Sequence, residues 1–359
     1  MTLLLPFCYN LFMRIFILLL ILLLSLPAET LKQEIARMLV VGFTGTRLDL
    51  NSSLAQMIEK YPLGGVIFFS SNMKNRKQVR TLTDQLQRLN SDRLLIGVDQ
   101  EGGYVDRLGK LPDLFKTPSA ADIASMDRLK AAGFYHRMAA ALHELGFNLD
   151  FAPSVDLAIN PKNRVIVGFQ RSYGPSPGAV VANASLLIDA LHSAHILTVL
   201  KHFPGHGSSA GDSHEGFTDV SQSWHSEELL PFLKLIGSGR ADMVMSAHIF
   251  NRHLDPIYPA TLSKKVIGLL LRKEIGFTGV VISDDLQMGA IRKNYTLDEA
   301  IVSAVNAGVD MLLFGNQIGK PYDVQMLIDR IAALVESGKI SRKRIAEANR
   351  RIVKLKEKL

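Results

Sequence analysis

The stretch "KHFPGHGSSAGDSHEG", from Lys201 to Gly216, holds three histidines, a lysine and an aspartate within sixteen residues that also include four glycines. Pro204 and the glycines exclude a regular helix or strand over most of this length. No helical or alternating period extends from Lys201 to Trp224, which predicts a long loop. Structureless loops of this length in compact domains are usually functional. Three interpretations remain: a metal site, a proton-transfer site or an ordinary polar loop.

For a metal, His202 and His206 together with Asp212 or His214 supply enough ligand atoms. However, the four-residue spacing of the first two histidines brings ligands together on a helix, and Phe-Pro-Gly between them forbids one. For proton transfer, Asp212 and His214 stand two residues apart, so the carboxylate can orient the imidazole and raise its pKa. In the third interpretation Asp212 caps a turn and His214 faces the solvent.

Two further stretches end apolar runs with acids. In "VVISDDLQMGA", Asp284 and Asp285 directly follow Val280–Ser283, where they can act in a site, bind a metal or cap the next helix. In "GVDQEGGYVDRL", Asp99 ends a run and two glycines allow the backbone to approach a ligand. Arg107 can reach that ligand, or it can form an internal ion pair with an aspartate of the same loop.

The elements that must position these residues repeat along the chain. Short apolar runs suited to strands buried on both faces occur at 38–43, 64–69, 94–99, 147–152, 196–203, 242–248, 278–284 and 309–315. Helical patterns lie between them, at 53–61, 76–90, 125–146, 178–195, 226–239, 263–276 and 296–308. Eight strand–helix units in this length predict an α/β fold, a TIM (β/α)8-type barrel forming a single catalytic domain over residues 29–359. A doubly wound sheet is disfavoured, because "GFTGTR" after the first run lacks its phosphate-binding fingerprint.

A barrel places its active site at the carboxyl ends of the strands. Polar residues at those ends are therefore expected to converge. They are Asp99 with Gln100 and Glu101, Asp156, Lys201 with His202, His248, and Asp284 with Asp285.

Composition bounds the alternatives. The 359 residues are 47% hydrophobic and 21% charged, as in a globular protein, and the net charge of +7 is spread along the chain. The absence of a basic run or of basic–aromatic clusters argues against nucleic acid as a partner. The single cysteine, Cys8, precedes the predicted domain, which excludes disulfides and a thiol nucleophile there.

The first 28 residues have the order of a secretory signal peptide: Arg14, an apolar run from Ile15 to Leu24, then Ser-Leu-Pro-Ala. We expect cleavage near Ala28 and a periplasmic or secreted protein. The alternative is an uncleaved membrane anchor over residues 11–28, which would be the only contact with a membrane. Met13 can also serve as the start of translation.

Taken together, these motifs resemble the bacterial β-N-acetylglucosaminidases of glycoside hydrolase family 3. "VDQEGG", "RSYG", "KHFPGHG…DSH" and "SDDLQM" occur in the family's order and at similar spacings, over nearly the whole chain after residue 28. The resemblance implies that Asp284 is the nucleophile of a retaining mechanism and that His214, held by Asp212, is the general acid/base. It also implies that Asp99, Arg107, Arg171, Lys201 and His202 bind the N-acetylglucosamine unit.

The resemblance implies a carbohydrate substrate, such as a peptidoglycan fragment or a chitooligosaccharide, and no cofactor or metal; we expect a monomer. Two stretches depart from the family pattern. Tyr104 stands where many relatives carry arginine, and "NPKNRVIVGFQRSYG" before and around Arg171 is longer than usual. Four alternatives remain open: a related β-glycosidase, a phosphorylase, a metal-dependent barrel hydrolase and a catalytically silent sugar-binding barrel. The phosphorylase is included because a histidine acid/base, unlike a carboxylate, does not repel phosphate.

Overall fold

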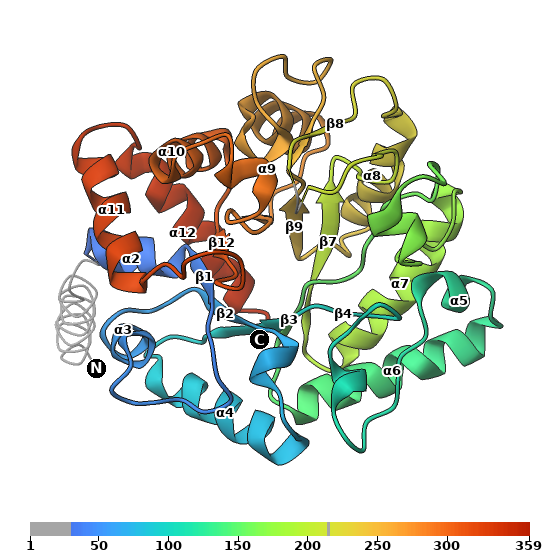
Figure 1. Cartoon of the computed structure of the whole chain (residues 1–359), viewed down its shortest axis with the longest axis horizontal. Coiled ribbons are helices and arrows are strands. Elements are labelled where there is room, and N and C mark those ends of the chain that lie inside the picture. Colours follow the sequence, from blue (N-terminus) through green and yellow to red (C-terminus); the bar gives the residue numbers. More distant parts are fainter. Residues whose placement is uncertain (1–29, 214–215) are drawn as a thin grey trace, which may run out of the picture. The chain divides into compact units, whose positions relative to one another are not determined.

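Strands and helices alternate along the chain in the computed structural model, which describes residues 30–213 and 216–359 (Figure 1). The compact unit Lys32–Leu359 carries the barrel. The expected signal segment 1–28 and the predicted acid/base His214 lie outside the described residues. Within the described ranges, none of the helices has both the length and the apolar character needed to cross a membrane.

Eight parallel strands form one sheet in which each strand neighbours the next along the chain. They are β1 (Leu39–Gly42), β2 (Gly65–Phe68), β3 (Leu95–Val98), β6 (Leu149–Asp150), β7 (Leu197–Phe203), β9 (Met243–Ser246), β11 (Val280–Ser283) and β12 (Leu312–Phe314). Each predicted apolar run contains one of these strands, and every residue of the eight strands is buried. The barrel prediction is therefore confirmed.

The sheet closes by two different contacts. β1 pairs with β12 over three residues, with Leu39 opposite Leu312. On the other edge, β11 and β12 share an isolated bridge between Ile282 and Met311 in place of a regular ladder. Asp310 strengthens this seam, because one of its carboxylate oxygens accepts a hydrogen bond from the amide of Val281 at 3.0 Å. Three arginine side chains pair with the same buried carboxylate: Arg272, Arg344 and Arg351.

Helices surround the strands (Figure 1). They are α2 (Leu31–Arg37), α3 (Ser53–Lys60), α4 (Arg76–Leu89), α5 (Ala120–Ala124), α6 (Arg128–Glu144), α7 (Pro177–Ser193), α8 (Leu230–Gly237), α9 (Gly289–Arg292), α10 (Leu297–Ala307), α11 (Val324–Glu336) and α12 (Arg342–Lys356). Short 3-10 turns are η1 (Ser70–Asn72), η2 (Leu108–Lys110), η4 (Ser226–Leu229) and η5 (Ala260–Leu262), and η3 (Arg164–Gly168) and η6 (Lys264–Glu274) are π-helices. The predicted helix 263–276 is thus wound more widely than an α-helix.

Helix α4 shows why these segments fold as they do. The Asn75 side chain caps its first turn by accepting from the amide of Gln78. Val79, Leu82 and Leu86 recur at helical spacing and are buried, so one stripe of the helix packs inward.

Two small sheets extend the strand ends. β4 (Gln100–Gly102) and β5 (Val105–Asp106) form an antiparallel hairpin directly after β3. β8 (Thr218–Asp219) pairs with β10 (Ile249–Phe250), which fastens the loop after β7 to the loop after β9. The predicted long loop is therefore shorter at both ends, because residues 201–203 extend β7 and 218–219 form β8.

Candidate active site

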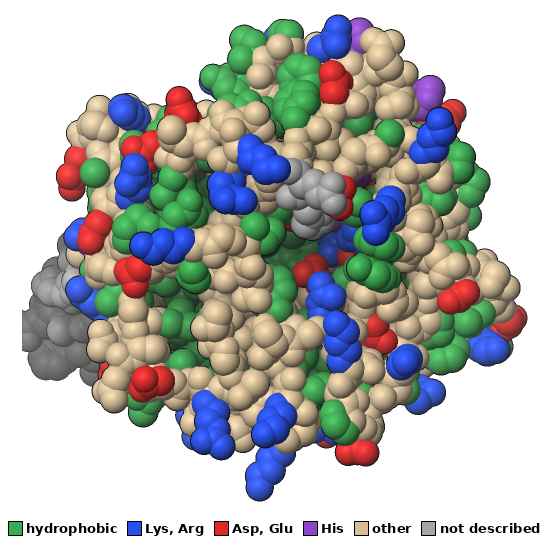
Figure 2. Space-filling view, in the orientation of Figure 1, with side chains coloured by type: hydrophobic (Ala, Val, Ile, Leu, Met, Phe, Trp, Pro, Cys, Tyr) green, Lys and Arg blue, Asp and Glu red, His purple; other side chains and the backbone are tan. Residues whose placement is uncertain are grey.

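A cavity of about 230 Å³ opens at the carboxyl ends of the strands. In Figure 2 this face is hollowed near its middle, with acidic and basic side chains inside the hollow. Seven of the eight predicted site residues line it: Asp99, Arg107, Arg171, Lys201, His202, Asp212 and Asp284. His214, the eighth, is outside the described residues. The structure thus brings together residues that lie up to 185 positions apart, from 99 to 284.

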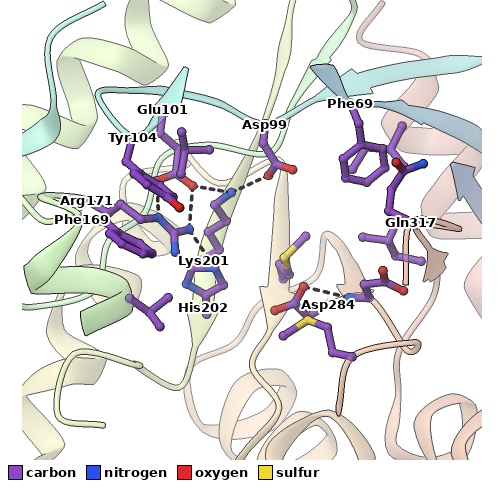
Figure 3. Close-up of a pocket in the computed structure, with 18 of the residues that line it drawn as sticks. Phe69, Asp99, Glu101, Tyr104, Phe169, Arg171, Lys201, His202, Asp284 and Gln317 are labelled. Atoms are coloured by element: carbon purple, nitrogen blue, oxygen red, sulfur yellow. Dashed lines mark hydrogen bonds and ion pairs between the residues drawn. The ribbon is translucent and has the colours of Figure 1, made fainter. Parts of the chain in front are cut away.

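Lys201 lies at the centre of the polar side of this cavity (Figure 3). Its side chain is only 2% exposed, and its ammonium group is 2.8 Å from an oxygen of Asp99 and 2.7 Å from one of Glu101. Burial alone would lower the pKa of Lys201, but the two carboxylates raise it above its ordinary value. Lys201 is therefore a fixed cation that donates hydrogen bonds.

Arg171 completes the same cluster. Its guanidinium donates from Nε and Nη2 to the two oxygens of Glu101, at 2.9 and 2.8 Å. Such paired donation fixes both groups in one orientation. Burial would raise the pKa of Glu101, but Arg171 and Lys201 hold it well below its ordinary range. Glu101 therefore remains a carboxylate and serves as the counter-ion that keeps both cations in place.

His202 is oriented by Asp156, which follows β6. Nδ1 of the imidazole lies 2.6 Å from Asp156 Oδ2, and the other oxygen of Asp156 accepts from the amides of His202 and His206. Burial would raise the pKa of Asp156, yet its contacts with the two histidines lower it to about 2. Nε2 of His202 lies 3.4 Å from Nη2 of Arg171, so the imidazole edge borders the guanidinium inside the cavity.

Asp284 occupies the other side of the cavity from Arg171 (Figure 3). It follows β11 directly, its amide donates to the Ser246 carbonyl at 3.2 Å, and its Oδ1 accepts from the amide of Asp285 at 2.8 Å. Asp285 accepts from the amide of Gln287 and so closes a turn, whereas the next helix begins only at Gly289. The alternative in which Asp285 caps the next helix is therefore not realised, because the N-cap residue of α9 is Met288.

The loop that carries Asp212 is fixed from inside. His206 is buried, with Ser209 Oγ 2.8 Å from Nδ1 and Ser213 Oγ 3.3 Å from Nε2. Burial and neighbouring His202 lower the pKa of His206 to about 4. Glu228 accepts from the amides of Gly207 and Ser208, and burial raises the pKa of this carboxyl to about 7. His206 therefore acts as a structural residue of the loop.

Other expected residues have structural partners. His248 is buried between Thr261 and the carbonyl of Asp285, at 2.8 and 3.0 Å. Arg107 lines the cavity, and among the residues that the structure describes its buried Nε has no hydrogen-bond partner. Within residues 30–213 and 216–359 there is no group of three or more metal-ligating side chains arranged to hold an ion.

Two residues without a predicted role hold the site together, Glu101 and Asp156. Both follow predicted strands in the sequence, so their position near the site could be predicted. Their roles depend on Arg171 and His202, which lie 70 and 46 residues away, and no local pattern indicates such pairs.

Comparison with known proteins identifies the family of the chain. Residues 30–355 match the family described as "Glycosyl hydrolase family 3 N terminal domain". Beta-hexosaminidase A of Pseudoalteromonas piscicida is 33% identical over 341 residues, covering 86% of this chain and 56% of that protein. Beta-hexosaminidase of Alkalilimnicola ehrlichii is 37% identical over 287 residues, covering 77% and 80%.

Solved structures of glycoside hydrolase family 3 also superpose on this chain. A glycoside hydrolase family 3 β-N-acetylglucosaminidase from Paenibacillus sp. str. FPU-7 superposes with a TM-score of 0.83 and 36% identity, over 92% of this chain and 63% of that one. A family 3 glycosyl hydrolase of Mycobacterium smegmatis superposes with a TM-score of 0.80 and 30% identity, over 91% and 97%. The chain has the barrel fold of these glycoside hydrolases. It belongs to glycosyl hydrolase family 3, and it spans 56% of the length of the first of these curated relatives.

Proposed function

We propose that this chain is an exo-acting β-N-acetylglucosaminidase that removes terminal β-linked N-acetylglucosamine. The observation that carries the proposal is the placement of Asp284 across one small cavity from the cluster of Lys201, Glu101 and Arg171. Lys201, Arg107 and Arg171 can donate hydrogen bonds to sugar oxygens, and Asp99 can accept from hydroxyls. A cavity of about 230 Å³ suits one terminal sugar better than the middle of a polymer.

The proposed reaction has two steps. In the first, the carboxylate of Asp284 attacks the anomeric carbon while the bond to the leaving oxygen breaks, and His214 gives its proton to that oxygen. In the second, water loses a proton to His214 and attacks the anomeric carbon, which frees Asp284. Asp212 orients His214 in both steps. A histidine can serve as acid and then as base because its ordinary pKa lies near neutrality.

The test compares hydrolysis of methyl β-N-acetylglucosaminide and methyl β-glucoside by the purified chain. We expect turnover of the N-acetyl sugar alone, a loss of at least about 10³-fold in kcat for Asp284→Asn, and no effect of EDTA. Asp285→Asn is the matched comparison, because it changes the neighbouring carboxylate and is expected to cost far less. A slowly turned-over fluorinated β-glycoside should leave a sugar covalently bound to the peptide that contains Asp284.

Other results would redirect the assignment. Loss of activity with EDTA would support a metal-dependent hydrolase. Release of a sugar phosphate in phosphate buffer would support a phosphorylase. Binding of the sugar without any turnover would support a sugar-binding barrel.

We also propose that the enzyme acts outside the cytoplasm, on peptidoglycan fragments or chitooligosaccharides. The support is the signal-like order of residues 1–28. Cell fractionation tests this: activity is expected in the periplasm or medium with residues 1–28 removed. Activity in the cytoplasm with these residues attached would contradict it.

A further inference from the structure

Two aromatic rings are stacked at the mouth of the cavity, Tyr104 and Phe169. Their centroids are 3.8 Å apart and their planes differ by only 7° (Figure 3). Both side chains line the same cavity as Asp99 and Arg171. Tyr104 is nevertheless 64% exposed, and because Phe169 covers one of its faces, the other face is open to solvent. Exposed aromatic surface beside a polar pocket is typical of a binding surface.

The two rings come from distant parts of the chain. Tyr104 is the residue at the tip of the β4–β5 hairpin. Phe169 directly follows η3, inside the stretch 160–174. The two residues are 65 positions apart in the sequence, yet they form one stacked pair. They therefore make up one feature of the site.

The hairpin that carries Tyr104 is held firmly. Gly102 and Gly103 adopt φ values of +91° and +60°, which glycine allows at little cost. The amide of Gly103 donates to the Thr117 carbonyl at 2.9 Å, and the Gln100 side chain accepts from the amide of Arg107 at the far end of the hairpin. The ring of Tyr104 is thus positioned before any ligand arrives.

The segment that carries Phe169 is held in the same way. Asn163 accepts from the amide of Ile166 at 2.8 Å and donates to the carbonyl of His206 at 2.7 Å. The second bond joins this segment to the loop that carries Asp212. Because both supports are rigid, binding to the stacked rings costs little ordering of the protein.

We propose that this stacked pair binds the pyranose ring on the leaving-group side of the cleaved bond. The cluster around Lys201 is polar and suits the first sugar, whereas the stack offers a flat apolar face. A β-linked pyranose with equatorial substituents has such a face of axial C–H groups, and these carry the partial positive charge that an aromatic face attracts. The proposal rests on the proposed function and adds to it that the preferred leaving group is a sugar.

The experiment compares three substrates with the same N-acetylglucosamine unit: the methyl glycoside, the hexyl glycoside and the β-1,4-linked disaccharide of N-acetylglucosamine. Tyr104→Ala and Phe169→Ala are expected to lower kcat/KM about three- to tenfold for the disaccharide and less than about twofold for the methyl glycoside. Tyr104→Trp should restore the activity on the disaccharide. Tyr258→Ala, which removes another partly exposed tyrosine outside the cavity, is the matched control and should change neither.

Each other outcome has a defined meaning. Equal losses on methyl glycoside and disaccharide would overturn the inference in favour of a structural role for the rings. An equal loss of kcat/KM on the hexyl glycoside would mean that the rings bind any apolar group and not specifically a pyranose, which would overturn the inference. No loss on the disaccharide would also overturn it. If the unaltered enzyme hydrolyses none of the three, the proposed function itself fails, and this inference fails with it.

Discussion

Nδ1 of His202 lies 2.6 Å from Oδ2 of Asp156, while Nε2 of the same imidazole lies 3.4 Å from Nη2 of Arg171. An arginine has only donors, so Nε2 must accept and the proton must be on Nδ1. Asp156 therefore selects the tautomer of His202 in which the single lone pair of Nε2 faces Arg171. The pair thereby helps to hold the guanidinium of Arg171 at the cavity, where it can donate to a sugar oxygen.

Replacing Asp156 by asparagine should weaken substrate binding. The amide can donate to Nδ1 and so favour the opposite tautomer, which places a donor against Arg171. We expect KM for the methyl N-acetylglucosaminide to rise about tenfold, with a smaller change in kcat. Ser154→Ala, which removes only a 3.1 Å hydrogen bond to the same carboxylate, is the control. An unchanged KM in Asp156→Asn would show that the tautomer does not matter.

Replacing Glu101 by glutamine should destabilise the fold as well as the site. Arg171 and Lys201 would then be buried without their shared counter-ion, and breaking such a buried pair costs about 3–5 kcal/mol. The free energy of unfolding in urea measures this loss. Arg240→Gln breaks an exposed ion pair with Asp189 and should change it little. A loss in Glu101→Gln as small as in the control would contradict the account.

The carboxyl of Glu228 should make stability depend on pH. Its folded-state pKa is raised to about 7, whereas the unfolded chain has the ordinary value of 4.5. Between these values the folded state binds more protons, so this group stabilises the fold below pH 4.5 and loses that effect as the pH rises through 7. Full loss amounts to at most about 3 kcal/mol.

The measurement is the difference in unfolding free energy between Glu228→Gln and the unaltered chain. From pH 5 to pH 8, the unfolding free energy of Glu228→Gln should increase relative to that of the unaltered chain. A difference is needed because His206, with its pKa lowered to about 4, acts in the opposite direction: it loses stability as the pH falls below about 6.5. A difference that is constant with pH would mean that Glu228 is ionised throughout.

Replacing Asp310 by asparagine should open the seam between β11 and β12. Three arginines would lose a buried counter-ion, and we expect a loss of about 3–5 kcal/mol. Amide hydrogen exchange should become faster at Ser283 and Met311, whose amides bond across the seam. Asp323→Asn, at the exposed cap of α11, is the control. Unchanged exchange at the seam would show that Asp310 does not hold it.

The fold could be predicted from the sequence because each strand is a continuous apolar run and needs no distant information. The cavity could be predicted in outline, because strand ends in a barrel converge. The role of Glu101 as a counter-ion could not be predicted, since it depends on Arg171, which lies in another loop. The stacking of Tyr104 on Phe169 could not be predicted either, because the two residues are 65 positions apart and only the folded chain brings the two rings together.

β1 pairs with β12, with residue 39 opposite residue 312, so this edge of the first strand can pair only after the last strand has been synthesised. While the protein is being synthesised, the edge of β1 remains unpaired until nearly the whole chain has left the ribosome. Barrel closure is therefore a late folding event, and long-range pairing of this kind is slow. A polypeptide cut short before residue 310 would keep two open sheet edges, which are prone to aggregate.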